Sequence, residues 1–229
     1  MVRIGLSFVV AGLLTAVAAK ADVPADLELN LGTSVSYNIQ VSSTTADTVK
    51  LTIDRADLDK VKGGEKVLVT LTPSEVVLKP NTPVNIEFKV TVPTDSPSFE
   101  AVKIGVNSKS NGGRVNVGET MVAVKAIYEV ALKGNSPEEW SLPKTASFST
   151  HKNGLLVRFL NYDKTKKHQI HSGGAIPHSD NPLEAANEQG PVGSYEYTVK
   201  SAATPSKAGV YCHDHEGFGQ TRTLNFNVQ

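Results

Sequence analysis

Three residues that can bind a metal ion lie close together near the C-terminal end of the chain. Cys212 is the only cysteine among 229 residues, His215 follows it by three positions, and Gln220 follows His215 by five. A thiolate, an imidazole and an amide oxygen on one short loop can bind one side of a single ion. Gly217 and Gly219 let such a loop fold back tightly, because glycine adopts conformations that other residues avoid.

This mixture of ligands suits copper. Cu(I) prefers a soft thiolate and Cu(II) prefers imidazole, and two histidines, one cysteine and a long axial Met or Gln form an electron-transfer geometry. The loop carries one imidazole at His215, so a second must come from another strand. Zinc fits less well, because closed zinc sites usually use more thiolates or histidines in shorter paired spacings. A dinuclear copper centre needs two cysteines on one loop, which this chain lacks.

The segment around Cys212 resembles the cupredoxins, in particular the plastocyanin-like loop that ends in an axial methionine. The resemblance rests on Gly209-Val210-Tyr211-Cys212-x-x-His215-x-Gly217-x-Gly219-Gln220, and it covers about residues 140–229. In that family the first histidine ligand follows an asparagine at the end of a strand. The stretch Phe159-Leu160-Asn161-Tyr162-Asp163, followed by His168, is similar to this element.

The resemblance implies a Greek-key sandwich with His168, Cys212 and His215 as equatorial ligands of one copper ion. Gln220 stands where the family usually has methionine, and a glutamine there is similar to stellacyanin-type sites. It implies a lower reduction potential, because an amide oxygen favours the oxidised ion. If Gln220 is not axial, Phe218 takes its place and the site is three-coordinate.

Other histidines lie near these candidates in the sequence. His171, His178 and His213 are possible second-shell or accessory metal ligands. His171 competes with His168 for the equatorial position, but residues three apart in a strand point to opposite faces, so both cannot easily serve. His213 beside Cys212 is similar to multidomain copper enzymes, in which that histidine binds a second copper. His151 has no potential partner nearby and is expected to be solvated.

Composition and the N-terminus indicate an exported protein. Residues 1–21 combine Arg3, an apolar run and the small-x-small site Ala19-Lys20-Ala21, as a signal peptide does. No second apolar run follows, so no membrane insertion is expected. The remaining chain carries a net charge of −2, which does not support nucleic-acid binding. One cysteine cannot form an internal disulfide, and metal ligation would protect it in an oxidising compartment.

The rest of the chain predicts an all-β fold of two β-sandwich domains. Residues 22–133 hold about seven short strands separated by turn residues, which is typical of a sandwich and weakly resembles bacterial immunoglobulin-like modules. Residues 134–140 are punctuated by Gly and Pro and predict a linker, and residues 141–229 form the metal-binding domain. Strands are expected at 34–41, 66–71, 76–78, 84–92, 102–106, 122–130, 154–160, 167–171, 195–199, 209–211 and 221–228, with one helical turn at 181–186.

The leading hypothesis is a periplasmic or secreted mononuclear copper protein that exchanges electrons with redox partner proteins, without enzymatic activity. The resemblance implies an electron port at the rim near His215. One alternative is a periplasmic copper-binding or delivery protein, favoured by the clustered histidines. Another is a copper oxidoreductase with a second metal at His213. A structural immunoglobulin-like protein without a metal is the fourth. The oligomeric state stays open.

Overall fold

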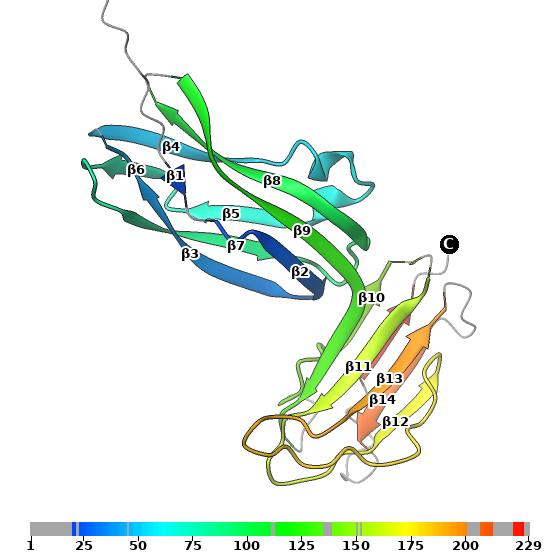
Figure 1. Ribbon diagram of the computed structural model, residues 1–229. Coiled ribbons are helices and arrows are strands. Elements are labelled where there is room, and N and C mark those ends of the chain that lie inside the picture. The colour runs from blue at the N-terminus through cyan, green and yellow to red at the C-terminus, as the bar shows by residue number, and fades with distance from the viewer. Residues whose placement is uncertain are drawn as a thin grey trace, which may run out of the picture.

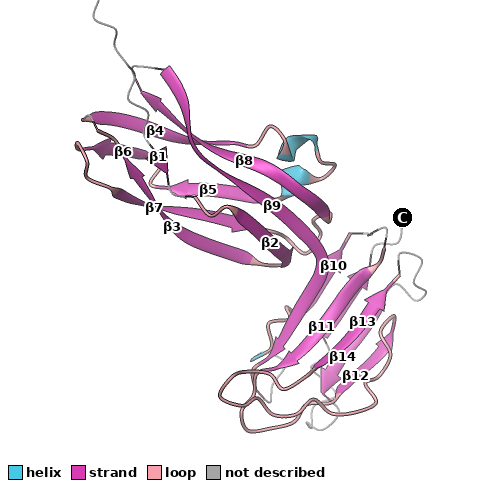
Figure 2. Ribbon diagram, viewed as in Figure 1, coloured by secondary structure: helices cyan, strands magenta, loops and turns pink. Residues whose placement is uncertain are grey.

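The structure is a computed structural model, and it describes residues 20–21, 23–44, 46–110, 113–134, 139–149, 151, 153–200, 207–212 and 222–226. The expected signal peptide lies outside these residues except for Lys20 and Ala21. Strands dominate both units of the molecule, and the helical segments of the described chain are the short 3-10 turns η1 (Leu58–Lys60) and η2 (Gly64–Lys66) (Figure 2). No helix of the described part is long and apolar enough to span a membrane. The prediction of an all-β fold is confirmed.

The first unit is an immunoglobulin-like β-sandwich (Figure 1). One sheet has the order β1-β3-β7-β5, and the other contains β2, β9, β8, β4 and β6. Apolar residues alternate with polar ones along these strands, so each sheet buries one face. The strands are β1 (Lys20–Ala21), β2 (Asp26–Leu31), β3 (Ser34–Ser42), β4 (Asp47–Asp54), β5 (Leu68–Thr72), β6 (Glu75–Leu78), β7 (Val84–Thr91) and β8 (Phe99–Ser110).

The strand β9 (Gly113–Leu132) belongs to both units. Its first part pairs with β8 and β2, and Ile127 to Leu132 then pair in parallel with β11 (Leu155–Asn161) of the second unit. Figure 1 shows this single ribbon running from the upper unit into the lower one. The chain therefore crosses between the units inside β9, upstream of the expected linker at 134–140.

The residues after β9 fold back onto it. Trp140 is buried and forms an isolated bridge with Leu132, and its indole Nε1 donates a hydrogen bond to the carbonyl of Gly134 at 3.3 Å. The described ends of the expected linker are therefore attached to the second unit.

The second unit is also a two-layered sandwich. One layer consists of the end of β9 with β11 and β13, and the other has the order β10-β15-β14-β12. The parallel pairs β9–β11 and β10–β15 join segments that are far apart in the sequence. The remaining strands are β10 (Thr145–Phe148), β12 (Ile170–Gly174), β13 (Ser194–Val199), β14 (Lys207–Cys212) and β15 (Arg222–Phe226).

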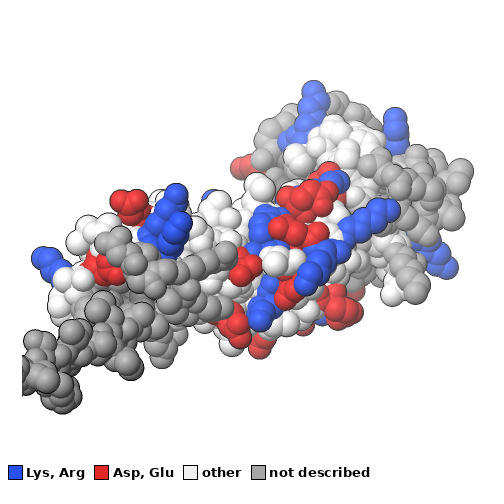
Figure 3. Space-filling model, turned by 90° about the horizontal axis from the view of Figure 1, so that it is seen from above, with Lys and Arg blue, Asp and Glu red and all other residues white. Residues whose placement is uncertain are grey.

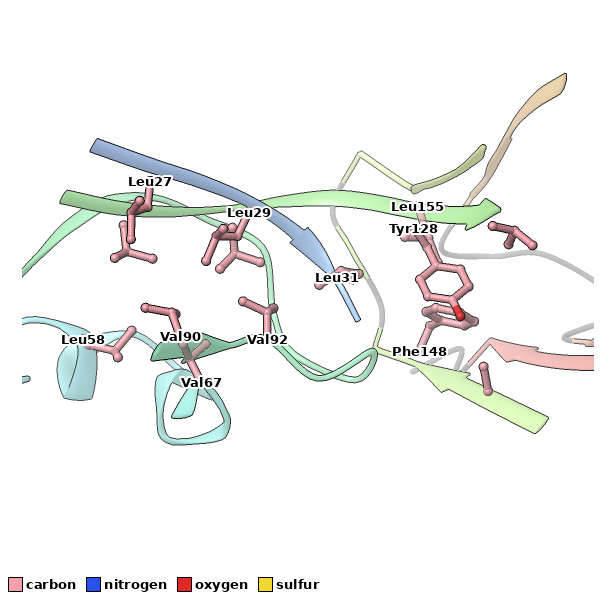
Figure 4. Packing of buried hydrophobic residues seen from close by; sticks show 14 of the residues in the cluster. Leu27, Leu29, Leu31, Leu58, Val67, Val90, Val92, Tyr128, Phe148 and Leu155 are labelled. Carbon is pink, nitrogen blue, oxygen red and sulfur yellow. The ribbon is translucent and has the colours of Figure 1, made fainter. Parts of the chain in front are cut away.

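One continuous hydrophobic core runs through both units and the joint between them. In Figure 4, Leu27, Leu29 and Leu31 of β2 lie across from Val90 and Val92, and the ring of Tyr128 then packs against Phe148. These two rings meet edge to face with centroids 4.8 Å apart. Burial raises the pKa of Tyr128 to about 12. The joint is thus packed with apolar side chains.

Polar contacts also connect the two units. Glu129 accepts hydrogen bonds from Asn30 at 2.8 Å and from Arg158 at 3.3 Å, which links β2 to β11 across β9.

On the face shown in Figure 3, acidic and basic side chains are interspersed.

The expectation that His151 is solvated is wrong. Its side chain is only 4% exposed, and its Nδ1 lies 3.0 Å from the hydroxyl of Ser98 in the first unit. Burial lowers the pKa of this imidazole, because the cationic form is poorly solvated there. The ring is buried because the turn before β11 packs against the segment that leads into β8, a long-range contact that an isolated histidine in a loop does not reveal.

Candidate metal centre

The strand β14 ends at one predicted ligand, Cys212, and the strand β12 begins two residues after another, His168. The two strands pair antiparallel, with Ile170 opposite Cys212 (Figure 1). Both of these side chains are buried in the inner layer, and Cys212 is 4% exposed. His168 precedes Ile170 by two positions, so a regular strand would place its side chain on the same inner face.

His168 is fully buried, with an exposed fraction of 0%. It lies two residues before the start of β12 and forms an isolated bridge with Leu183, whereas Ile170, the first residue of β12, pairs with Cys212. The register therefore places the backbones of His168 and Cys212 near the same end of this strand pair. His215, Gln220, His213 and Phe218 lie outside the described residues.

Two backbone hydrogen bonds with Leu183 hold the main chain of His168. Its N–H donates to the carbonyl of Leu183 at 3.1 Å, and its own carbonyl accepts from the N–H of Leu183 at 2.8 Å. Trp140 packs edge-on against its ring with centroids 6.3 Å apart. Leu183 thus lies in an extended bridge, and the prediction of a helical turn at 181–186 is wrong. Pairing with His168 stabilises the extended form there.

Asn161 connects the three segments around this histidine. Its Nδ2 lies 2.9 Å from the carbonyl oxygen of Lys166, 3.2 Å from that of Leu183 and 2.9 Å from that of Glu184. Its Oδ1 accepts a hydrogen bond from the N–H of Asp163 at 2.9 Å. A single buried amide at the end of β11 therefore ties together both loops that flank His168.

Asp163 orients the imidazole of His168. Its Oδ2 lies 3.3 Å from Nε2 of His168, and its Oδ1 accepts hydrogen bonds from the Thr165 hydroxyl at 2.6 Å and the Thr165 N–H at 2.8 Å. Burial opposes ionisation of Asp163, but these hydrogen bonds and His168 outweigh it and lower its pKa to about 2. Because a carboxylate can only accept, Nε2 carries the proton and Nδ1 carries the lone pair in the neutral ring.

A contact of this kind also accompanies histidines that bind a metal. Metal-binding histidines usually donate their other ring N–H to a carboxylate or carbonyl, which fixes the tautomer and the ring orientation. Sequence reasoning missed the role of Asp163. The only local signal was the Asp163-x-Thr165 pattern, in which an aspartate side chain bonds the backbone two residues on.

His171 and His178 lie together, on the face of the sheet opposite to His168. His171 lies opposite Tyr211 in the register and stacks on its ring, with centroids 4.5 Å apart. His178 contacts His171 as well, with the two ring centroids 4.7 Å apart. The outer face thus holds His171, while the inner face holds His168, as expected for two residues three apart. Within the described part of the chain, no group of three His, Cys, Asp or Glu side chains forms a metal cluster.

Asp163 also makes a testable contribution to stability. Its folded pKa of about 2 lies below the ordinary value for an aspartate, so it stabilises the fold at neutral pH, and this contribution disappears as the pH falls. We expect the wild-type protein to lose about 2 kcal/mol of unfolding free energy between pH 5 and pH 2 that the Asp163→Asn variant does not lose. Urea unfolding of both proteins at several pH values measures this difference.

The two pH profiles should run parallel above pH 5, because Asp163 is then ionised in both the folded and the unfolded wild-type protein. Identical slopes below pH 5 would mean that Asp163 is not selectively stabilised as a carboxylate.

Comparisons with known proteins do not place the chain in a family. No family model matches it, and no curated protein matches it. Among solved structures it is similar to a GspB Siglec domain, with a TM-score of 0.33 and 13% identity over 52% of this chain and 65% of that domain. It is similar to the SrpA adhesin of Streptococcus sanguinis, with a TM-score of 0.31 and 12% identity over 53% of this chain and 69% of the adhesin.

A third similar structure comprises domains 4 and 5 of the S-layer protein SbsC, with a TM-score of 0.27 and 12% identity over 47% of this chain and 50% of that one. The chain thus spans less than two thirds of the Siglec and S-layer structures. With TM-scores below 0.5, these likenesses carry no argument about the metal centre or its function.

Proposed function

We propose that the chain is an exported mononuclear type 1 copper protein that transfers electrons between partner proteins and is not itself an enzyme. One observation supports this proposal: Ile170, which pairs with the buried Cys212, follows the fully buried His168 by only two residues. His215 and Gln220 follow Cys212 closely in the sequence. The donor set of one thiolate, two imidazoles and an amide oxygen fits copper.

The protein would contribute a rigid and dry set of ligands. His168 would bind through Nδ1, because Asp163 accepts the proton on Nε2. Cys212 is anchored by the ladder of β14, and His168 by its double bridge to Leu183. Copper would supply the one-electron couple between Cu(II) and Cu(I). Ligands held by strands and buried from water would change little in position between these states.

The test is the visible absorption and EPR spectrum of the mature protein with one equivalent of Cu(II). We expect an intense blue or green charge-transfer band and a narrow copper hyperfine splitting, which report Cys–copper bonding. A matched sample with Zn(II) should stay colourless. A pale solution with an ordinary tetragonal copper signal would overturn the electron-transfer proposal and favour copper storage or delivery by the surrounding histidines.

A further inference from the structure

A second group of histidines lies on the outer face of the sheet, away from Cys212. The rings of His171, His178 and Tyr211 are half-buried there, so solvent reaches them. His171 and His178 meet at right angles, with planes 88° apart and centroids 4.7 Å apart. Tyr211 stacks on His171 with the planes 30° apart and limits rotation of that ring.

We propose that His171 and His178 form a second metal site, which binds a borderline divalent cation such as Zn²⁺ through one nitrogen of each ring. This site goes beyond the proposed electron transfer, because the sheet separates it from the inner face that holds Cys212. Imidazole nitrogen suits such cations. Two protein ligands leave the other coordination positions to water or a second ligand, so the bound ion would be exchangeable.

The spacing of the two rings fits this use. A zinc ion about 2.0–2.1 Å from one nitrogen of each imidazole would hold the ring centres about 4.5–5 Å apart, for bond angles between square and tetrahedral values. The observed 4.7 Å lies within that interval. The ring centres are therefore already at the separation that such an ion requires, and binding would turn the rings so that one nitrogen of each faces the ion.

The backbone already holds the two histidines next to each other. His171 belongs to β12. The residue before it, Ile170, accepts a hydrogen bond through its carbonyl from the N–H of Ser179 at 3.0 Å. The N–H of Ile170 donates to the Ser179 hydroxyl at 3.1 Å, and the Gln169 amide donates to the Ser179 carbonyl at 3.1 Å. Because His178 directly precedes Ser179, these contacts fix it beside His171. Ordering the two ligands before binding reduces the entropic cost of capturing an ion.

A titration of the metal-free full-length protein with Zn²⁺ at pH 7.5 tests the site. Imidazole resonances in long-range ¹H–¹⁵N NMR spectra report each histidine separately. We expect the ring signals of His171 and His178 to shift together with a single apparent Kd. The same response should occur in the Cys212→Ser variant, so failure of the inner copper site would not abolish it.

Single substitutions provide the decisive comparison. His171→Gln and His178→Gln should each weaken binding at the outer site by at least about tenfold, and the second change should add less than the first, because either one already removes the two-ligand site. The Asp180→Asn variant, which changes an exposed neighbour, should bind like wild type. Independent shifts of the two rings, or a His178 signal that responds in His171→Gln with the same Kd as in the wild-type protein, would overturn the proposal.

Discussion

Replacing Cys212 with serine should abolish the intense visible band of the copper-loaded protein. A serine hydroxyl is a harder and weaker ligand than a thiolate, and it provides no sulfur-to-copper charge transfer. Loss of a residue that only supports a metal ligand typically lowers the metal affinity about 10–100-fold. Because Cys212 is itself the proposed ligand, we expect its replacement to lower the Cu(I) affinity by more than that. Absorption spectra and a competition titration with a Cu(I) chelator measure the two effects.

The matched control is Ala208→Ser, which places a hydroxyl on the same buried face of β14, away from the metal end. This variant should lose stability because an unpaired hydroxyl is buried, yet it should keep the coloured copper band. If the Cys212→Ser protein retained the band, the thiolate could not be its source, and the assignment of Cys212 as a ligand would be wrong.

Asn161→Ala should cause the largest loss of stability among changes that do not touch a proposed ligand. The side chain is 1% exposed and is the shared partner of three backbone carbonyls and one N–H. Its removal leaves these buried groups unsatisfied, which we expect to cost about 3–4 kcal/mol of unfolding free energy. The variant should also bind copper more weakly, because Asn161 holds the loops on both sides of His168. Urea unfolding and copper titration measure these losses.

Asn187→Ala serves as the control, because Asn187 is exposed and its side-chain Oδ1 accepts a hydrogen bond within its own turn, from the N–H of Gln189 at 2.8 Å. It should change the unfolding free energy by less than about 1 kcal/mol. Equal effects of the two substitutions would show that the buried network of Asn161 does not carry the stability assigned to it.

Much of the fold follows from alternating side chains. The patterns at 34–41 and 84–92 predict β3 and β7 to within a residue, because each strand buries every second side chain. The same pattern is present in Leu27, Leu29 and Leu31 of β2, which the sequence analysis did not identify. The continuity of β9 could not be predicted, since alternation looks the same in one long strand and in two strands of separate sandwiches.

The candidate centre could be predicted only in part. The types and spacing of Cys212 and its neighbours indicate a metal, and the family resemblance selects His168. The structure adds the contacts that hold His168 in place: Asp163 contacts its ring, and Leu183 pairs with its backbone. These depend on how loops distant in sequence meet, and no local pattern encodes that.

The shared strand β9 has a consequence for how this protein can be divided. A fragment that begins at residue 134 would lack the strand that pairs with Leu156 to Asn161, and it would present the unpaired backbone of β11 as an open edge. Such edges recruit other chains, so the fragment would tend to self-associate. The C-terminal half is therefore not a transferable module. Its first strand is the end of β9, which begins in the other unit. A gene fusion that starts after β9 would therefore encode the second sandwich without one strand of its sheet.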